Sequence, residues 1–167
     1  QTEKNLIRHH NIQLMRETLK PSDYQGYDII IVSSTSKEEA DYQQLQLEKV
    51  FAGATSQHGR QPIILSVLDS TEGGQIIGSV YTWMQAETLV REKHPDLLKG
   101  THSLFDYIKL NRLKAACFHN GGKGERCSPL TQSLGNSRGS QKLVGSVTNA
   151  QNVTIELDIL SSVVLQC

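Results

Sequence analysis

Three short apolar runs constrain the fold of this chain more than any other feature of its sequence. They cover residues 29–32, 63–68 and 113–118. The first is an unbroken run of β-branched residues, which is typical of a strand buried on both faces. Segments with helical periodicity separate the runs. Strands that alternate with helices favour a mostly parallel sheet with right-handed crossovers. We therefore expect an α/β fold, a Rossmann-like sheet with helices on both faces.

Helices are predicted between and around these strands. Ser36-Lys37-Glu38-Glu39 is a capping box, and the helix that it opens ends near Gly53. Further helices are expected at residues 5–18, 79–91, 97–109 and 153–164, and a short strand at 143–147. The final helix would carry Glu156 and Asp158, so these carboxylates are not interpreted as a metal pair. The domain prediction is an N-terminal helical extension at residues 1–24 and the N-terminal portion of an α/β domain at residues 25–167.

The third apolar run passes directly into a glycine-rich segment, Asn120-Gly121-Gly122-Lys123-Gly124-Glu125-Arg126. Closely spaced glycines let backbone N–H groups approach a ligand, and such groups at the end of a strand form an anion site. The guanidinium group of Arg126 adds a positive charge and N–H donors that suit phosphate oxygens. We interpret the segment as a nucleotide-binding loop, with a tight surface turn as the alternative. It is not a Walker loop, because Gly124 stands where Ser or Thr is required, and it lacks the third glycine of a dinucleotide fingerprint.

Polar segments follow all three predicted strands, at residues 33–35, 69–71 and 119–121. Ligands of parallel sheets bind beyond the carboxyl ends of the strands, so these segments would converge if the strands are neighbours. Asp69 is a candidate for binding Mg²⁺ or a ribose hydroxyl, or else it caps the following turn. His119 is a candidate nucleotide contact, with a structural hydrogen bond as its alternative. His58 is expected on the solvated surface.

The glycine-rich segment continues to Pro129-Leu130-Thr131, and Lys142 follows downstream. This pattern resembles the signature loop of the sugar-1-phosphate nucleotidyltransferases (nucleotide-sugar pyrophosphorylases), which have a GT-A-like fold. Glu125 stands where that loop has threonine, and no proline follows Lys142. The order of elements over roughly residues 27–147 looks most similar to the fucose-1-phosphate guanylyltransferase (fucose pyrophosphorylase) family.

The resemblance implies a reaction and its residues. A sugar-1-phosphate oxygen would attack the α-phosphorus of a nucleoside triphosphate and release pyrophosphate, with Mg²⁺ as the cofactor. Arg126 would hold the β- and γ-phosphates, and Lys142 the α-phosphate or the sugar phosphate. The residues that would cradle the nucleotide are Asn120, Gly121, Gly122, Lys123 and Gly124. The superfamily carries its main metal-binding aspartate on a later strand than this sequence contains, so weak or no turnover is expected from this chain.

The amino-acid composition limits the classes of partner and the location that we expect for this protein. Seventeen basic and seventeen acidic residues leave no net charge, which argues against a dedicated nucleic-acid or membrane-surface binder. No apolar run is long enough to span a bilayer, and no signal peptide is recognised. Three cysteines without a C-x-x-C pair indicate a reducing compartment and no zinc site. The expected location is the cytoplasm.

Two other functional classes remain open. One is a non-catalytic module that binds a nucleotide or a sugar phosphate and regulates another activity. The other is a structural α/β interaction domain whose loop binds nothing. Neither the base nor the sugar can be read from the sequence.

Overall fold

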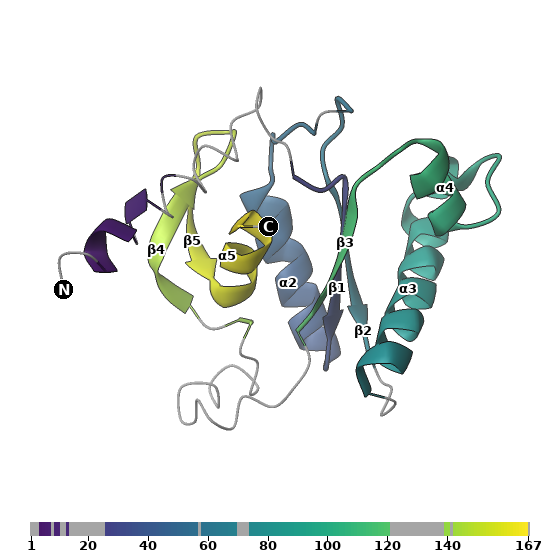
Figure 1. The fold of residues 1–167 in the computed structure, drawn as a ribbon, viewed down its shortest axis with the longest axis horizontal. Coiled ribbons are helices and arrows are strands. Elements are labelled where there is room, and N and C mark those ends of the chain that lie inside the picture. Colours follow the sequence, from purple (N-terminus) through teal and green to yellow (C-terminus); the bar gives the residue numbers. More distant parts are fainter. Residues whose placement is uncertain are drawn as a thin grey trace.

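The computed structural model of the chain describes residues 4–7, 9–10, 13, 26–56, 58–69, 74–120, 139–140 and 142–166. Three layers make up the body of the molecule, with a sheet between two groups of helices (Figure 1). Of the helix expected at residues 5–18, residues 5–7, 9–10 and 13 are described, and these are helical.

The central sheet consists of β1 (Ile29–Ser34), β2 (Ile63–Leu68) and β3 (Ala115–His119). All strand pairs are parallel and the order is β2-β1-β3, which places Ile31 opposite Leu65 on one side and Cys117 on the other. The three apolar runs therefore form the predicted parallel sheet. All six residues of β1 are buried, because this strand lies in the centre of the sheet and is covered on both faces.

Helices cover both faces of the sheet, as predicted. On one face, α3 (Gly74–Lys93) and α4 (Leu104–Leu110) pack in one apolar cluster with Ile29 and Ile31. On the other face, α2 (Lys37–Val50) and α5 (Ile159–Gln166) pack in a second cluster with Ile30 and Val32. The alternation of side chains along a strand explains this division, since successive residues of β1 point to opposite faces.

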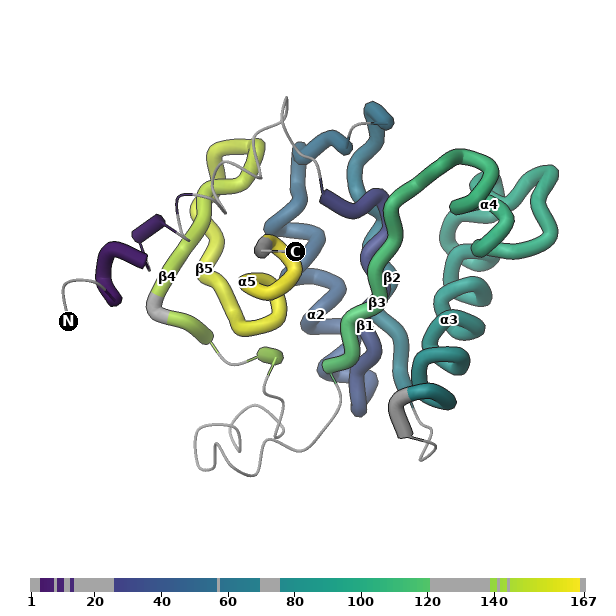
Figure 2. Tube along the Cα trace, viewed as in Figure 1, coloured from purple at the N-terminus to yellow at the C-terminus, as the bar shows by residue number. Residues whose placement is uncertain are grey.

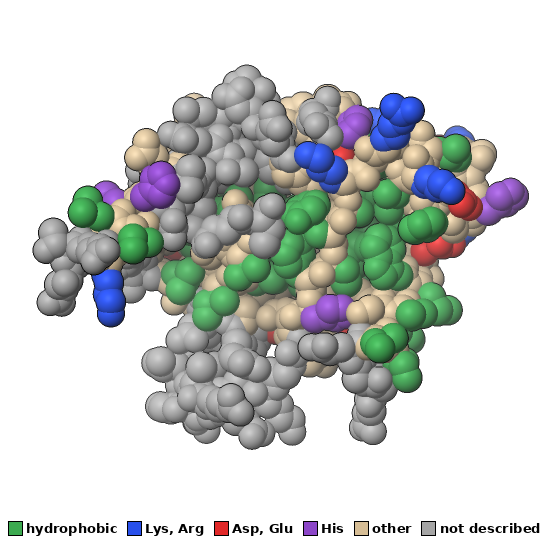
Figure 3. Space-filling model, in the orientation of Figure 1, with side chains coloured by type: hydrophobic (Ala, Val, Ile, Leu, Met, Phe, Trp, Pro, Cys, Tyr) green, Lys and Arg blue, Asp and Glu red, His purple; other side chains and the backbone are tan. Residues whose placement is uncertain are grey.

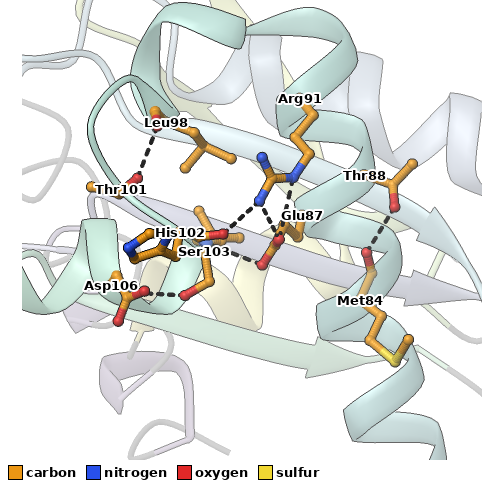
Figure 4. Close-up of polar contacts among 10 residues, drawn as sticks. Met84, Glu87, Thr88, Arg91, Leu98, Thr101, His102, Ser103 and Asp106 are labelled. Carbon is orange, nitrogen blue, oxygen red and sulfur yellow. Dashed lines mark hydrogen bonds and ion pairs between the residues drawn. The ribbon is translucent and has the colours of Figure 1, made fainter.

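The helix predicted at residues 97–109 is split in two. A short 3-10 helix, η1 (Pro95–Leu98), ends before Gly100, whose φ of +82° lies outside helical geometry. A new N-cap at Ser103 then opens α4, and the Ser103 hydroxyl accepts a hydrogen bond from the backbone N–H of Asp106. Glu87 of α3 accepts hydrogen bonds from Arg91 and from the backbone N–H of Leu104, which ties the two helices together (Figure 4).

The prediction of a helix at residues 153–164 was wrong for the first half of that range. Here β4 (Lys142–Thr148) pairs antiparallel with β5 (Thr154–Asp158), and α5 begins only at Ile159. Asn152 adopts a left-handed φ of 61° in the turn between the strands, a conformation that asparagine tolerates better than most residues. Pairing with β4 satisfies the backbone of β5 and buries Leu157, so tertiary contacts override the apparent helical spacing. The strand expected at 143–147 is confirmed as β4.

Candidate functional site

The carboxyl ends of the three parallel strands meet at one edge of the sheet, which we call the carboxyl edge. The backbone N–H of Asn120, just after β3, donates to the carbonyl of Ser33 at 3.0 Å. On the other side of β1, the N–H of Asp69 donates to the carbonyl of Ser34 at 2.8 Å. The predicted convergence of the three polar segments is thereby confirmed for these residues. The start of α2 lies at the same side of the molecule (Figure 2).

A buried carboxylate organises this edge. The Glu39 side chain is 8% exposed, and its Oε2 accepts hydrogen bonds from the backbone N–H and the hydroxyl of Thr35, both at 3.0 Å. Its Oε1 accepts from Nδ2 of Asn120 at 2.9 Å. Glu39 therefore fixes Asn120, the first residue of the glycine-rich segment.

Residues 139–140, the next described residues along the chain, lie close to Asn120. Gly139 lies so close to Asn120 that a Cβ at position 139 would overlap the Asn120 side-chain amide. Its carbonyl accepts from the N–H of Leu160 at 3.0 Å. The neighbouring Ser140 hydroxyl accepts a hydrogen bond from buried Gln43 of α2 at 2.8 Å. Residues 120 and 139–140 are thus held together beside α2.

His119 lies between two serine hydroxyls at this edge. Its Nδ1 is 3.1 Å from the Ser33 hydroxyl and its Nε2 is 2.9 Å from the Ser79 hydroxyl of α3. These hydrogen bonds agree with the structural alternative given for His119. Cys117 lies on the same face of the strand, with its Sγ 3.8 Å from His119 Nε2. Burial, and then the negative charge of Asp69, raise the pKa of the Cys117 thiol to about 11, so it is protonated at neutral pH.

Lys142 lies against α2. Its Nζ is 5.3 Å from the centroid of the Tyr42 ring, a cation–π distance, and it pairs with Asp158 in the β4–β5 register. Tyr42 follows Glu39 by three residues, about one helical turn along α2. Burial, and then the charge of Asp158, raise the pKa of the Tyr42 hydroxyl well above its usual value. The structure thus brings Lys142 to the helix that carries Glu39.

The other sequence-predicted site residues, Gly121, Gly122, Lys123, Gly124 and Arg126, lie outside the described residues. Within the described ranges, no cluster of three or more His, Cys, Asp or Glu side chains could hold a metal ion. No helix in the described part of the chain has both the length and the hydropathy needed to cross a membrane.

His58 is exposed, as expected, and it also has a buried partner. Its Nδ1 is 2.9 Å from a carboxylate oxygen of Asp28, which is 6% exposed at the amino end of β1. Burial by itself would raise the pKa of Asp28, but hydrogen bonds from Ser56, the backbone N–H of Lys114 and His58 outweigh it and hold that pKa below its usual value. This pair joins elements at the end of the sheet opposite the carboxyl edge.

Sequence reasoning missed the role of Glu39. The capping box correctly places it at the third position of α2, and its backbone N–H does bond to the Ser36 hydroxyl at 3.1 Å. The side chain bonds Thr35 and Asn120 at the carboxyl edge. The available signal was a carboxylate in the first helical turn directly after a buried strand.

Comparisons of the chain with protein-family models, with curated proteins and with solved structures gave no match. What the protein does must therefore be inferred from its own residues and their arrangement.

Proposed function

We propose that the carboxyl edge binds the phosphates of a nucleoside triphosphate, and that the protein transfers the nucleotidyl group to a sugar-1-phosphate with release of pyrophosphate. The observation that carries the proposal is the anchoring of Asn120. This residue directly precedes the G-G-x-G-x-R segment and bonds both Ser33 and Glu39 at the carboxyl edge. Parallel sheets bind nucleotides in that position.

The chemistry needs positioning and charge neutralisation more than covalent help from the protein. In the proposal, amides of Gly121, Gly122 and Gly124 cradle the phosphates, with Lys123 beside them, and Arg126 holds the β- and γ-phosphates as they leave. Lys142 supplies positive charge for the α-phosphate or the sugar phosphate. A GT-A-like nucleotidyltransferase fold of the fucose pyrophosphorylase kind is the corresponding family proposal.

Mg²⁺ is part of the proposal, and the described residues were considered for its ligands. Mg²⁺ takes one or two carboxylates and completes its octahedron with phosphates and water. Half-buried Asp69 directly follows β2 on the carboxyl edge, where the phosphates would lie in this proposal. Asp69 is therefore the carboxylate that we propose for such a site. When bound, the ion would neutralise phosphate charge.

Thermal unfolding with GTP, UTP, ATP or CTP and Mg²⁺ tests the binding step. A nucleotide at a hundred times its dissociation constant adds about 2.7 kcal/mol to the free energy of unfolding. We expect one triphosphate to stabilise the chain and Arg126→Ala to remove the effect. Arg112→Ala is the matched control, because Arg112 is exposed at the amino end of β3. Absence of stabilisation by all four would contradict the proposal and favour an interaction domain.

Pyrophosphate release in the presence of fucose-1-phosphate or other sugar-1-phosphates tests the transfer step. Release that requires both substrates supports a nucleotidyltransferase. Nucleotide binding without pyrophosphate release from any pair would instead favour the non-catalytic regulatory module.

A further inference from the structure

Among the described residues, no strand pairs with one edge of β3. β1 pairs with the other edge, and the carbonyl of Lys114 and the N–H of Asn120 both bond to β1. The backbone N–H and C=O groups of successive residues in a strand point in alternating directions. The odd-numbered residues between Lys114 and Asn120 therefore point these groups away from β1. Ala115, Cys117 and His119 therefore present unpaired backbone groups, and nothing among the described residues bonds to them.

This open edge lacks the usual protection against strand pairing. Proteins commonly place lysine, proline or a bulge on an exposed edge strand. β3 reads Ala-Ala-Cys-Phe-His, with no such residue, and its register with β1 is regular. An extended strand can pair with it without meeting a Lys, Arg, Asp or Glu side chain of β3.

An apolar groove lies beside the open edge. It has a volume of about 630 Å³ and is lined chiefly by apolar side chains of α3, α4 and the start of β3, among them Val80, Trp83, Met84, Phe105 and Ile108. Val80, Met84 and Phe105 are 57%, 63% and 66% exposed. Figure 3 shows hydrophobic side chains gathered on the face of the molecule that carries β3. Exposed apolar surface of this kind marks an interaction site.

The apolar groove carries little charge. Glu87 is the one charged side chain among its described lining residues, and Arg91 and the N–H of Leu104 already occupy its oxygens (Figure 4). The whole chain carries no net charge, so two copies do not repel each other at long range. A surface that is apolar and uncharged is complementary to itself.

We propose that a second copy of this chain pairs with the first through antiparallel contact of the two β3 edges, around a two-fold axis at Cys117. In that register Cys117 lies opposite its copy and Ala115 opposite His119, so all three outward-facing residues form hydrogen-bonded pairs. The two sheets become one, in the order β2-β1-β3-β3-β1-β2. The two apolar grooves then lie on the same face, where Met84 and Phe105 of each copy cover the other.

The helices are needed for this interface as well as the strand. A stable protein interface buries about 800 Å² on each partner, more than a five-residue strand supplies. The exposed apolar residues of α3 and α4 lie beside the strand and would add apolar area to the contact.

Two measurements test the proposal on the chain itself. Sedimentation equilibrium over a range of concentrations should show a dimer. Hydrogen exchange should show the amides of Ala115, Cys117 and His119 slowed by about tenfold or more as the dimer forms, because pairing protects them. Phe105→Asp should yield a monomer with fast exchange at these amides, and Val80→Asp should do the same. Leu45→Asp is the matched control, since Leu45 is 57% exposed on α2, and it should remain dimeric. Circular dichroism is the check that each variant is folded.

A chain that stays monomeric at submillimolar concentration would overturn the proposal. So would a dimer in which these three amides still exchange rapidly, because the contact would then lie elsewhere. A dimer that survives Phe105→Asp and Val80→Asp in folded protein would also contradict it.

Discussion

Asn120 donates a hydrogen bond of 2.9 Å from its Nδ2 to Oε1 of Glu39, across 81 residues of sequence. The two residues come from the end of β3 and the first turn of α2. Because Glu39 also accepts from Thr35 at the end of β1, one carboxylate connects both strands to the helix. The segment that begins after Asn120 therefore starts from a fixed point.

Replacing Glu39 tests whether that carboxylate holds the carboxyl edge. Glu39→Ala leaves the N–H of Thr35 and the Asn120 amide without their acceptor, so we expect the free energy of unfolding to fall by about 2–3 kcal/mol. Glu39→Gln keeps one acceptor oxygen and should lose less. Urea unfolding measures both, with Glu38→Ala as the neighbouring exposed control. Equal effects of Glu39→Ala and Glu38→Ala would show that the network contributes nothing.

A second prediction concerns the contact between Gly139 and Asn120. Gly139→Ala forces its new methyl group into the Asn120 amide and should destabilise the chain by about 1–3 kcal/mol. Asn120→Ala removes the obstructing amide. The double variant should therefore lose less stability than the sum of the two single variants, as a double-mutant cycle would record. Simple additivity would mean that the two residues do not meet.

The hydrogen bonds that Asp28 accepts from Ser56, the backbone N–H of Lys114 and His58 predict a pH dependence of stability. The pKa of Asp28 is lowered in the folded chain, so the unfolded chain takes up its proton at higher pH. By linkage, the contribution of Asp28 is complete above its ordinary value of 3.8 and is lost as the pH falls through the lower folded value.

Urea unfolding between neutral pH and pH of about 3 measures this effect. Asp28→Asn should flatten the fall in stability at acid pH, whereas Asp41→Asn, at an exposed position of α2, should leave the slope as it is. An unchanged slope in Asp28→Asn would contradict the assignment.

Cys117 should react slowly with alkylating reagents. At pH 8 a thiol with a pKa near 11 has roughly a hundredth of the thiolate of an ordinary cysteine, so iodoacetamide should label it about a hundred times more slowly. A variant with Cys127→Ser and Cys167→Ser isolates the signal, and the same protein in urea gives the reference rate. Equal rates in the folded and unfolded protein would refute the effect of burial and of Asp69.

Much of the fold could be predicted because its signals are local. The β-branched run in β1, the apolar run that becomes β2, and the serine cap of α2 each depend on neighbours within a few residues. The parallel arrangement follows from strands that alternate with helices. The meeting of Ser33, Asp69 and Asn120 at one edge follows in turn from that arrangement and the strand order.

What the sequence by itself determined, then, is the three strands of the parallel sheet, strand β4, the N-cap of α2 and the meeting of the three strand ends at one edge. Tertiary structure decided that residues 154–158 form a strand, because β4 supplies partners for their backbone. It also decided that Glu39 bonds Asn120 and that His58 bonds Asp28. The physical reason is that a buried polar group takes whichever partner the packed chain brings near it. These partners lie 81 and 30 residues away, beyond the reach of any local pattern.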